Sequence, residues 1–540
     1  MASLTESYAA GPAVPLAGAL TLGDLLRRAA GRSPTQPALR VARSAGEIVA
    51  SSTYAELLAD SELCARRLLS MFTPGDRIAV WADNRAEWVV LQFGAALAGL
   101  VLVTVNPAFT VAEAKHVLQQ SRARGCFAVA DYRGVALITL TRQLSAELAD
   151  LEQVYDLDDW AAFAAGPLAP QQLPVVGPTD PAMIQYTSGT TGVPKGALLL
   201  HGRLTANAEQ VALKAGLSEE SVWLAPLPLF HAGGCVVAVL GAVSRQATLV
   251  LMTEWNAQRA LELVEVEHVE IINAVPTMLL GMLGHADALT RDLRSLSSVL
   301  AGGAVVSADI VRELQERLGV RVFIIFGQTE CGPVATMTHA GDSPEDKQNT
   351  VGQALAGFEV RIVDRELGTT LPIGELGEFV ARGPTMAGYY ENDSATAAAF
   401  DADGWLHTGD LCSMDERGYV RVEGRIRDMI IRGGENIYPR EIEELLTSHP
   451  AVEDVAVVGL PDLTMGERVG AFVVLRNTES CDIESLTEFL RPVLARYKLP
   501  TEWVVITALP RTPTGKVRKF VLVDQWKAAA TSPSTIAINN

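Results

Sequence analysis

The sequence lacks the features that mark disulfide-stabilised, zinc-binding or exported proteins. Its six cysteines stand singly along 540 residues, with no Cys-x-x-Cys pair and no cluster of cysteine with histidine. We therefore expect neither a disulfide framework nor a zinc site, and a reducing cytoplasm suits such a chain. The first basic residue, Arg27, comes too late for a signal peptide.

Positive charge and aromatic side chains are also scarce. Lysine and arginine total 44 against 63 aspartates and glutamates, which gives a formal net charge of −19, and aromatic residues make up 6%. So acidic a surface repels nucleic acids and anionic lipid, and we expect no binding to nucleic acid. An anionic ligand needs a local positive site. Hydrophobic residues reach 49%, enough for large cores in two or more domains.

One apolar run, residues 88–105, has the length of a membrane span. We expect a soluble-protein core here instead: a buried helix over 85–98, a break at Gly99, and a strand over 100–105 that ends at Asn106-Pro107. No membrane span is therefore predicted.

Helix-like and strand-like segments alternate along most of the chain. The pattern predicts a helix over 53–70 capped by Thr53, a strand over 77–82, a helix over 111–122 and a strand over 126–130. Such alternation is typical of an α/β fold with mostly parallel sheets flanked by helices.

A boundary near residue 425 separates a small α+β unit of roughly 100 residues. We predict a large N-terminal domain over 1–424 and a small C-terminal domain over 430–540, with residues 425–429 between them. Just before the boundary, the pattern predicts a strand at 418–423. In the small domain it predicts helices at 439–448 and 483–496, strands at 452–458, 469–475 and 502–506, and a frayed tail beyond Lys527.

The most informative motif is YTSGTTGVPKG, residues 186–196, between two apolar runs. Its five hydroxyls, three glycines and one of only eight lysines can direct N–H, hydroxyl and ammonium groups at a polyphosphate. It is not the nucleotide-kinase P-loop, because Val193 and Pro194 separate Gly192 from Lys195. Taken alone, the motif also fits an exposed Ser/Thr/Gly linker.

Four further motifs are individually modest. FGQTE follows a predicted strand at 322–325, and the carboxyl end of a strand is where α/β proteins bind ligands. Each motif also has a plain structural interpretation, such as a solvated glutamate, a turn cap at Asp410 or a hairpin turn at Gly433-Gly434. The motifs are FGQTE (326–330), GWLHTGD (404–410), GRIRDMIIRGGENIYP (424–439) and PRTPTGKVRK (510–519).

In this order and spacing, the motifs resemble those of the adenylate-forming superfamily of acyl-CoA synthetases, luciferases and peptide-synthetase adenylation domains. The resemblance spans Leu22 to Lys519 and includes VNPAF (105–109), PLFHAGG (228–234) and AGGA (301–304). It is strongest for fatty-acid or aryl-acid CoA ligases. It implies that the chain converts a carboxylic acid and ATP, with Mg²⁺, to acyl-AMP and pyrophosphate, after which the thiol of coenzyme A displaces AMP.

The resemblance assigns the nucleotide site residue by residue. Glu330 would hold the magnesium ion, and Lys516 would bridge the carboxylate and the α-phosphate. The remaining assignments are Thr187, Ser188, Gly189, Thr190, Thr191 and Lys195 for the β- and γ-phosphates, Thr329 for the α-phosphate, Gly303, Ala304 and Phe326 for adenine, Asp410 and Arg425 for ribose, and Gly327 and Gln328 in the same site.

The acyl and CoA sites are assigned in the same way. His231 would gate the acyl pocket, although it also fits a packed core histidine. The small residues Gly233, Gly234, Gly302, Gly303, Gly327 and Gly332 predict a roomy apolar pocket for a long, branched or polycyclic acid. Gly433, Gly434 and Glu435 would form the CoA loop. The resemblance also implies a hinge over 425–429, with Arg427 in it, about which a mobile C-terminal domain alternates between the two half-reactions.

Three departures from the family pattern lie in the predicted large domain. Val305-Val306 replaces the usual Pro-Leu, RGPTMAGY (382–389) is one residue short, and Ser394 replaces a common proline. An impaired half-reaction would therefore be adenylation, leaving an enzyme that makes the thioester from a preformed acyl-adenylate. An acyl-AMP ligase that loads a carrier protein and a non-catalytic binding protein remain alternatives, as do a monomer and a homodimer.

Overall fold

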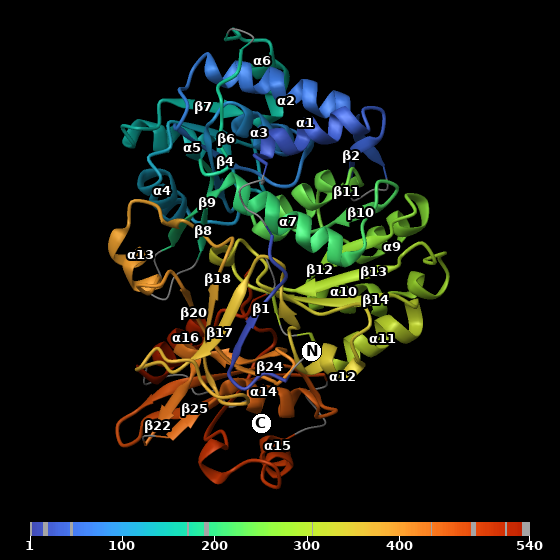
Figure 1. Cartoon of the computed structure of the whole chain (residues 1–540). Helices are drawn as coiled ribbons and strands as arrows, with labels where there is room; N and C mark the ends of the chain where they lie inside the picture. The colour runs from blue at the N-terminus through green and yellow to red at the C-terminus, as the bar shows by residue number, and fades with distance from the viewer. Residues whose placement is uncertain are drawn as a thin grey trace. The chain divides into compact units, whose positions relative to one another are not determined.

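The computed structural model describes residues 3–14, 20–43, 47–169, 172–187, 194–304, 306–433, 435–476, 482–512 and 516–531. The chain, whose helices and strands are labelled in Figure 1, divides into two compact units. The first comprises Met1–Arg361, Val380–Thr408 and Met414–Val420, and the second comprises Ile362–Phe379, Gly409–Ser413 and Arg421–Asn540. Helices and strands alternate through the chain, which confirms the predicted α/β class.

A seven-stranded sheet forms one part of the first unit, in the order β19-β9-β8-β5-β4-β6-β7. The five strands from β8 to β7 are parallel, and β9 and β19 add antiparallel at one edge. The strands are β4 (Arg77–Trp81), β5 (Val101–Val105), β6 (Gly125–Ala128), β7 (Gln153–Asp156), β8 (Pro181–Thr187), β9 (Lys195–Leu200) and β19 (Gly388–Tyr389), and the helices between them include α3 (Ala86–Leu97), α4 (Val111–Gln120) and α5 (Leu137–Glu147).

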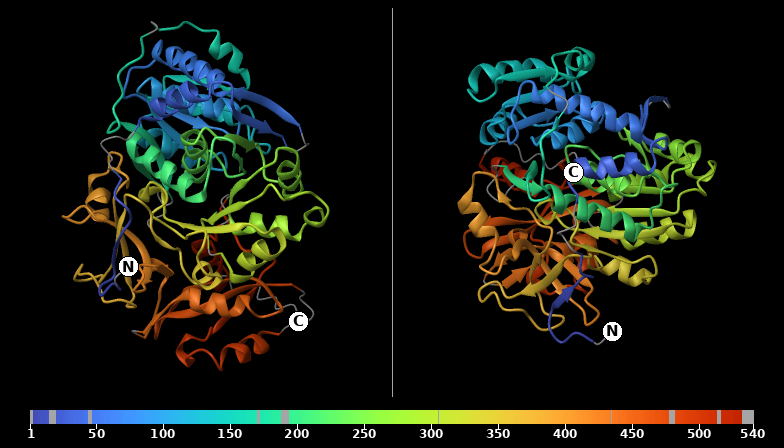
Figure 2. Two further views of the ribbon diagram at one scale, coloured as in Figure 1. Left: turned by 45° about the vertical axis from the view of Figure 1, so that its right-hand side comes forward. Right: turned by 45° about the horizontal axis from the view of Figure 1, so that its top comes forward.

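The run that resembled a membrane span is part of this core. It forms α3, buried from Trp88 to Leu97, and then the fully buried strand β5, as the sequence predicts. Helix α2 (Tyr54–Leu69) begins at Thr53, whose side chain and that of Glu56 form a capping box. Helices α1 (Leu22–Arg32), α2 and α3 lie side by side (Figures 1 and 2). In the part of the chain that the structure describes, no helix is both long and apolar enough to cross a membrane.

A nine-stranded sheet forms another part of the first unit, in the order β16-β15-β14-β13-β12-β10-β11-β2-β3. Six central strands are parallel, and a core of Val250, Ile272 and Val299 packs beneath their helices. The strands are β2 (Pro37–Ala42), β3 (Ile48–Thr53), β10 (Val222–Ala225), β11 (Thr248–Met252), β12 (Ile271–Ala274), β13 (Ser298–Gly302), β14 (Arg321–Phe326), β15 (Thr336–Met337) and β16 (Gln353–Ala354), with helices α7 (His201–Ala215), α9 (Ala257–Val266), α10 (Pro276–Gly284) and α11 (Ala308–Leu318).

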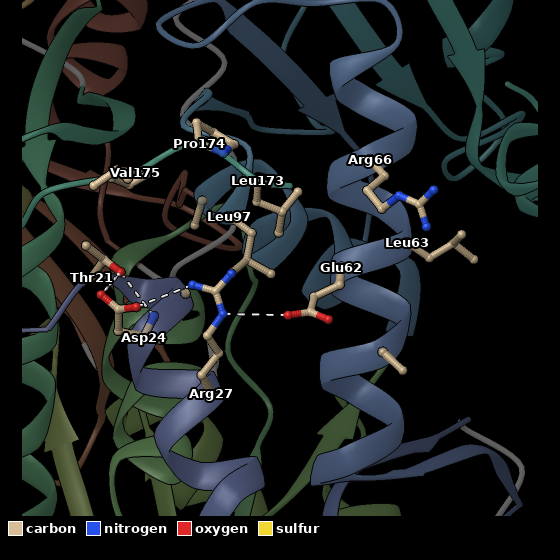
Figure 3. Close-up of a pocket in the computed structure, with 14 residues that line it drawn as sticks. Thr21, Asp24, Arg27, Glu62, Leu63, Arg66, Leu97, Leu173, Pro174 and Val175 are labelled. Atoms are coloured by element: carbon tan, nitrogen blue, oxygen red, sulfur yellow. Dashed lines mark hydrogen bonds and ion pairs between the residues drawn. The ribbon is translucent and has the colours of Figure 1, made fainter. Parts of the chain in front are cut away.

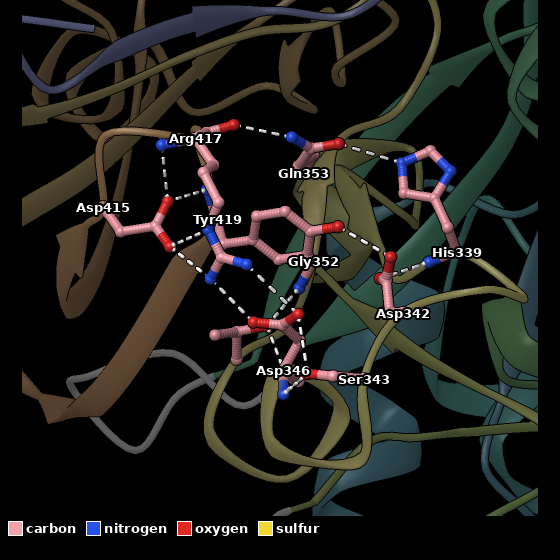
Figure 4. A network of polar contacts seen from close by, with 10 residues as sticks. His339, Asp342, Ser343, Asp346, Gly352, Gln353, Asp415, Arg417 and Tyr419 are labelled. Carbon is pink, nitrogen blue, oxygen red and sulfur yellow. Dashed lines mark hydrogen bonds and ion pairs between the residues drawn. The ribbon is translucent and has the colours of Figure 1, made fainter. Parts of the chain in front are cut away.

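A third sheet has the order β1-β17-β18-β20-β21. Its strands are β1 (Tyr8–Ala10), β17 (Glu359–Val363), β18 (Gly377–Arg382), β20 (Leu406–Met414) and β21 (Val420–Arg425), and the short helices α12 (Pro344–Asn349) and α13 (Asp393–Ala399) lie between them in the chain. Beside α12, a polar network fastens the preceding loop to the turn after β20 (Figure 4). Arg417 Nη2 lies 2.7 Å from Asp346 Oδ1, and the Tyr419 hydroxyl donates to Asp342 Oδ1 at 2.6 Å.

The last part of the second unit is an α+β structure around an antiparallel sheet, β23-β22-β25-β24, with β26 parallel to β25. Ile442, Leu446 and Leu486 pack on one face of it, and Leu522 packs against Phe472 in a separate cluster. The elements are β22 (Ile430–Arg432), β23 (Glu435–Ile437), α14 (Pro439–Thr447), β24 (Val452–Asp462), β25 (Gly466–Leu475), α15 (Ile483–Leu490), β26 (Glu502–Val505) and α16 (Lys519–Thr531).

Two predictions for this region are wrong. The helix predicted to reach residue 496 ends at Leu490, because Pro492 has no backbone N–H to continue the helical hydrogen bonds. The predicted fraying beyond Lys527 does not begin there, because α16 continues to Thr531 through three alanines, the strongest helix formers.

Candidate active site

Glu330 lies where three chain segments meet. It is in a single 3₁₀ turn, Thr329–Cys331, that follows β14, and it is 7% exposed. Its Oε1 accepts hydrogen bonds from Thr187 Oγ1 at 2.7 Å and from the Tyr389 hydroxyl at 3.1 Å. Thr187 ends β8 and Tyr389 ends β19, so side chains 143 and 59 positions away from Glu330 in the chain are held around its carboxylate.

Lys195 joins the same group from the start of β9. It is paired with Thr187 in the β8–β9 register, and its Nζ lies 5.3 Å from the centre of the Tyr389 ring. An ammonium, a hydroxyl and a carboxylate are therefore close together, which suits phosphate groups and a hard cation. Four of the predicted phosphate-binding residues lie outside the described residues: Ser188, Gly189, Thr190 and Thr191. The structure therefore describes only the two limbs of the predicted phosphate loop, Tyr186-Thr187 and Pro194-Lys195.

Helix α4 anchors both of these limbs. His116 Nε2 donates to the carbonyl of Pro194 at 3.0 Å, and Gln120 Nε2 donates to the carbonyl of Tyr390 at 2.6 Å. The Tyr186 hydroxyl donates to Gln120 Oε1 in turn, and burial raises the pKa of Tyr186. His116 and Gln120 are four residues apart and share one helix face. The sequence reasoning missed these positions; that spacing of two polar residues was the available signal.

The predicted adenine residues also meet at one sheet edge. Strands β13 and β14 are parallel neighbours, with Gly302 opposite Ile325, so Gly303-Ala304 and Phe326-Gly327 leave their strands side by side. Gln328 Nε2 donates to the carbonyl of Thr408 at 3.3 Å. Of the atypical pair, Val305 lies outside the described residues, and Val306 is buried in the core under the nine-stranded sheet. Val306 therefore replaces the usual leucine with a smaller core residue.

Packing explains four of the six glycines that the sequence predicted to line the pocket. An added Cβ would collide with backbone oxygens at these four, whereas at Gly233 it would meet only the end of the Leu227 side chain, which can move. The distances are 2.3 Å from Gly234 to Pro228 O, 2.5 Å from Gly302 to Ile325 O, 2.3 Å from Gly327 to Pro333 O, 2.1 Å from Gly332 to Pro384 O and 2.9 Å from Gly233 to Leu227 Cδ1. The small size of these four is thus explained without a roomy pocket. Only Gly303, with φ of 77°, meets nothing closer than 3.4 Å.

His231 is half-buried, at the entrance to an unusual helix. Its Nδ1 accepts a hydrogen bond from the backbone N–H of Gly233 at 3.1 Å, which fixes the ring at the start of a π-helical segment, Gly233–Leu240. Asn273 Nδ2 donates to the carbonyl of Gly233 at 2.9 Å and supports the same turn. π-Helical segments are rare in proteins, and those that occur are often at functional sites. This geometry therefore fits a histidine that faces the substrate.

The second unit holds the other predicted residues. Asp410 on β20 is 3% exposed, and Arg425 on β21 places its Nε 2.8 Å from Asp410 Oδ1, so the two predicted ribose residues are paired. Arg427 lies in a 3₁₀ turn, Ile426–Asp428, with its Nε 3.5 Å from Asp428 Oδ1.

The CoA-loop and lysine positions are in two turns of this unit. Gly433 has φ of 61° in the turn between β22 and β23, Glu435 begins β23 opposite Arg432, and Gly434 lies outside the described residues. The backbone N–H of Lys516 donates to Thr512 Oγ1 at 3.1 Å, and the Thr512 N–H donates to the Lys516 carbonyl at 2.8 Å. Lys516 is exposed.

A cavity of about 810 Å³ between α1 and α2 contains none of the predicted site residues (Figure 3). Its charged lining is balanced: Arg27 lies 3.4 Å from Asp24 and 3.6 Å from Glu62, and Arg66 adds a second cation. The convergence of reactive groups is at Glu330 and not here.

Comparison with known proteins identifies the family. Residues 26–390 match the AMP-binding enzyme family, and residues 441–516 match the AMP-binding enzyme C-terminal domain. The chain belongs to the AMP-binding enzyme family, as the motifs predict. It is an acyl-CoA synthetase, an acid–thiol ligase.

Three relatives illustrate the similarity. YngI of Bacillus subtilis, named as an acyl-CoA synthetase, is 36% identical over 87% of this chain and 91% of its own. The human mitochondrial medium-chain acyl-CoA ligase ACSF2 is 31% identical over 94% and 88%. ATP-bound MatB from Rhodopseudomonas palustris superposes with a TM-score of 0.85 at 28% identity, over 94% of this chain and all of the other. Since one relative is mitochondrial, the cytoplasmic location stays a prediction.

Proposed function

We propose that the enzyme works in two steps. It joins an apolar carboxylic acid to the α-phosphate of ATP, releasing pyrophosphate, and then transfers the acyl group from AMP to the thiol of coenzyme A. A carboxylate alone is a poor acyl donor, since its leaving group would be oxide. The observation that carries the proposal is the convergence of Thr187 from β8, Lys195 from β9 and Glu330 from the turn after β14.

These groups suit the charge that adenylation gathers. The Lys195 ammonium and the Thr187 hydroxyl would bind the β- and γ-phosphates, and Thr329 would donate to the α-phosphate. Preplaced donors and cations of this kind lower the barrier to phosphoryl and adenylyl transfer. Gly303, Ala304 and Phe326 would enclose the adenine at the β13–β14 edge, while Asp410, fixed by Arg425, would accept from the ribose hydroxyls.

The donor set at Glu330 fits Mg²⁺, which prefers oxygen ligands. Thr187 Oγ1 and Glu330 Oε1 are 2.7 Å apart, so both could belong to one coordination shell. The described residues contain no group of three or more His, Cys, Asp or Glu side chains able to hold an ion. Phosphate oxygens and water would therefore complete the shell. When bound, the ion would neutralise phosphate charge.

The predicted C-terminal domain, residues 430–540, would serve the two half-reactions in turn. Lys516 would bridge the substrate carboxylate and the α-phosphate during adenylation. Rotation about Arg427 would then bring the turn of Gly433, Gly434 and Glu435 to the site to receive the pantetheine arm. The exposure of Lys516 and the tight β22–β23 turn support these roles.

An apolar acid is supported by the segment that begins beside His231. The π-helix Gly233–Leu240 contains only glycine, alanine, cysteine, valine and leucine. The human relative is named for medium-chain acids. Because backbone packing explains four of the six glycines, these four do not support any particular size of acyl pocket. We propose a medium-length or longer apolar monocarboxylic acid.

The test measures each step separately. Purified enzyme is given a panel of straight-chain, branched and aromatic acids, and ATP–pyrophosphate exchange is followed. Thioester formation is then measured with coenzyme A or a carrier protein as acceptor. We expect exchange with an apolar acid and thioester with coenzyme A. Thioester only from supplied acyl-adenylate would show a partial-reaction enzyme, and no product in either assay would refute the proposal.

A further inference from the structure

Tyr389 contacts both charged groups of the candidate phosphate site. Its hydroxyl donates to Glu330 Oε1 at 3.1 Å, and its ring lies 5.3 Å from Lys195 Nζ. The carboxylate and the ammonium are the groups proposed to hold the cation and the phosphates. One side chain thus touches both.

Several backbone contacts fix the direction of this side chain. Tyr389 pairs with Ala197 in the β19–β9 register, and its N–H donates to Thr396 Oγ1 at 2.9 Å. The next residue, Tyr390, donates its N–H to the Gly196 carbonyl at 2.8 Å and accepts from Gln120. Strand, helix α13 and helix α4 therefore hold Tyr389 in place from three sides.

The two contacts have different physical natures. The phenol donates a hydrogen bond to a buried carboxylate and so limits the rotation of its oxygens. The ring face attracts the ammonium through its quadrupole, without consuming any of the three N–H donors that a phosphate would need. We propose that Tyr389 is a positioning residue that orients the Glu330 carboxylate through its hydroxyl and holds the Lys195 ammonium through its ring. This inference rests on the proposed function.

The two roles separate on mutation. Tyr389→Phe removes only the hydroxyl, and Tyr389→Leu removes the ring as well. Mn²⁺ serves as the probe, with its binding in the presence of ATP followed by electron paramagnetic resonance and ATP binding followed by calorimetry. Losing a hydrogen bond to a charged group should weaken Mn²⁺ binding about tenfold in Tyr389→Phe. ATP affinity in EDTA should not change in this variant, and it should fall about threefold in Tyr389→Leu.

Tyr8→Phe is the matched control, because it removes a phenol–carboxylate bond of the same kind, to Glu359 Oε2 at 2.7 Å. It should leave Mn²⁺ affinity unchanged. In a Glu330→Gln background, Tyr389→Phe should have no further effect on Mn²⁺ binding. Such non-additivity distinguishes positioning of Glu330 from a general loss of structure.

Two results would overturn the inference. One is a Mn²⁺ affinity equal to that of the wild type in folded Tyr389→Phe. The other is a loss of ATP affinity in Tyr389→Phe that is the same with and without the metal ion. If Tyr389→Phe does not fold, 3-fluorotyrosine at position 389 keeps the ring and strengthens the donor, and an unshifted Mn²⁺ affinity would again count against it. Failure of the wild type to bind ATP at all would instead refute the proposed function.

Discussion

Replacement of Asp410 by alanine tests the nucleotide site most directly. The carboxylate is 3% exposed and its partner Arg425 retains 34% side-chain exposure. If Asp410 accepts from both ribose hydroxyls, two hydrogen bonds to a charged group are lost, each worth about 1.5 to 3 kcal/mol. The sum of about 3 to 6 kcal/mol corresponds to a loss of ATP affinity of about 10²- to 10⁴-fold.

The same change also breaks an ion pair. A fully buried pair costs about 3 to 5 kcal/mol when one partner is removed, but Arg425 can reach water, so we expect about 1 to 3 kcal/mol of lost stability. Calorimetry with ATP measures the first effect and urea unfolding the second. Asp346→Ala is the control, because it removes the carboxylate that pairs with Arg417 at 2.7 Å and should cost stability while sparing ATP affinity. Unchanged ATP affinity in folded Asp410→Ala would refute the ribose assignment.

Three further outcomes are expected. Lys516→Ala should suppress pyrophosphate release by several powers of ten while sparing thioester formation from supplied acyl-adenylate; an equal loss in both assays would contradict separate roles. Gln120→Ala should cost about 1 to 3 kcal/mol in urea unfolding and raise the KM for ATP, since it loses one hydrogen bond to Tyr186 in the phosphate loop and one to the carbonyl of Tyr390, whereas the exposed neighbour Gln119→Ala should do neither. Burial lowers the pKa of His201 to about 4 from 6.5, so the free energy of unfolding should be highest above pH 6.5 and should decline as the pH falls towards 4. Urea unfolding should show a loss of about 2 kcal/mol at pH 5. A His201→Asn variant with the same pH profile as the wild type would argue against this.

The sequence allowed the fold class and the site motifs to be predicted because both are written locally. Strand β14 and the turn with Glu330 are adjacent in the chain, and parallel strands bring such turns to one edge. Contacts between distant segments were not predictable in this way. Gln120 and Tyr390 are 270 residues apart, and no local pattern records which carbonyl a helix side chain will reach.

Glycine illustrates a different limit of sequence reasoning. A missing side chain leaves room, but the sequence does not show whether a ligand or the protein's own backbone occupies that room. At Gly302 the occupant is Ile325 O, and at Gly332 it is Pro384 O. Conversely, the sequence does show the end of α15, since Pro492 lacks the N–H that a continuing helix needs, and the predicted helix did not take this into account.

The packed glycines constrain any attempt to change which acid the enzyme accepts. A mutant library at Gly234, Gly302, Gly327 or Gly332 would mostly sample misfolded protein, since each new side chain would displace a backbone segment. Substrate scope would then evolve more readily through side chains that already exist, such as those following His231 on the π-helix, than through glycines that hold the sheet edge together. Selection for a new acid should accordingly leave these four positions as glycine.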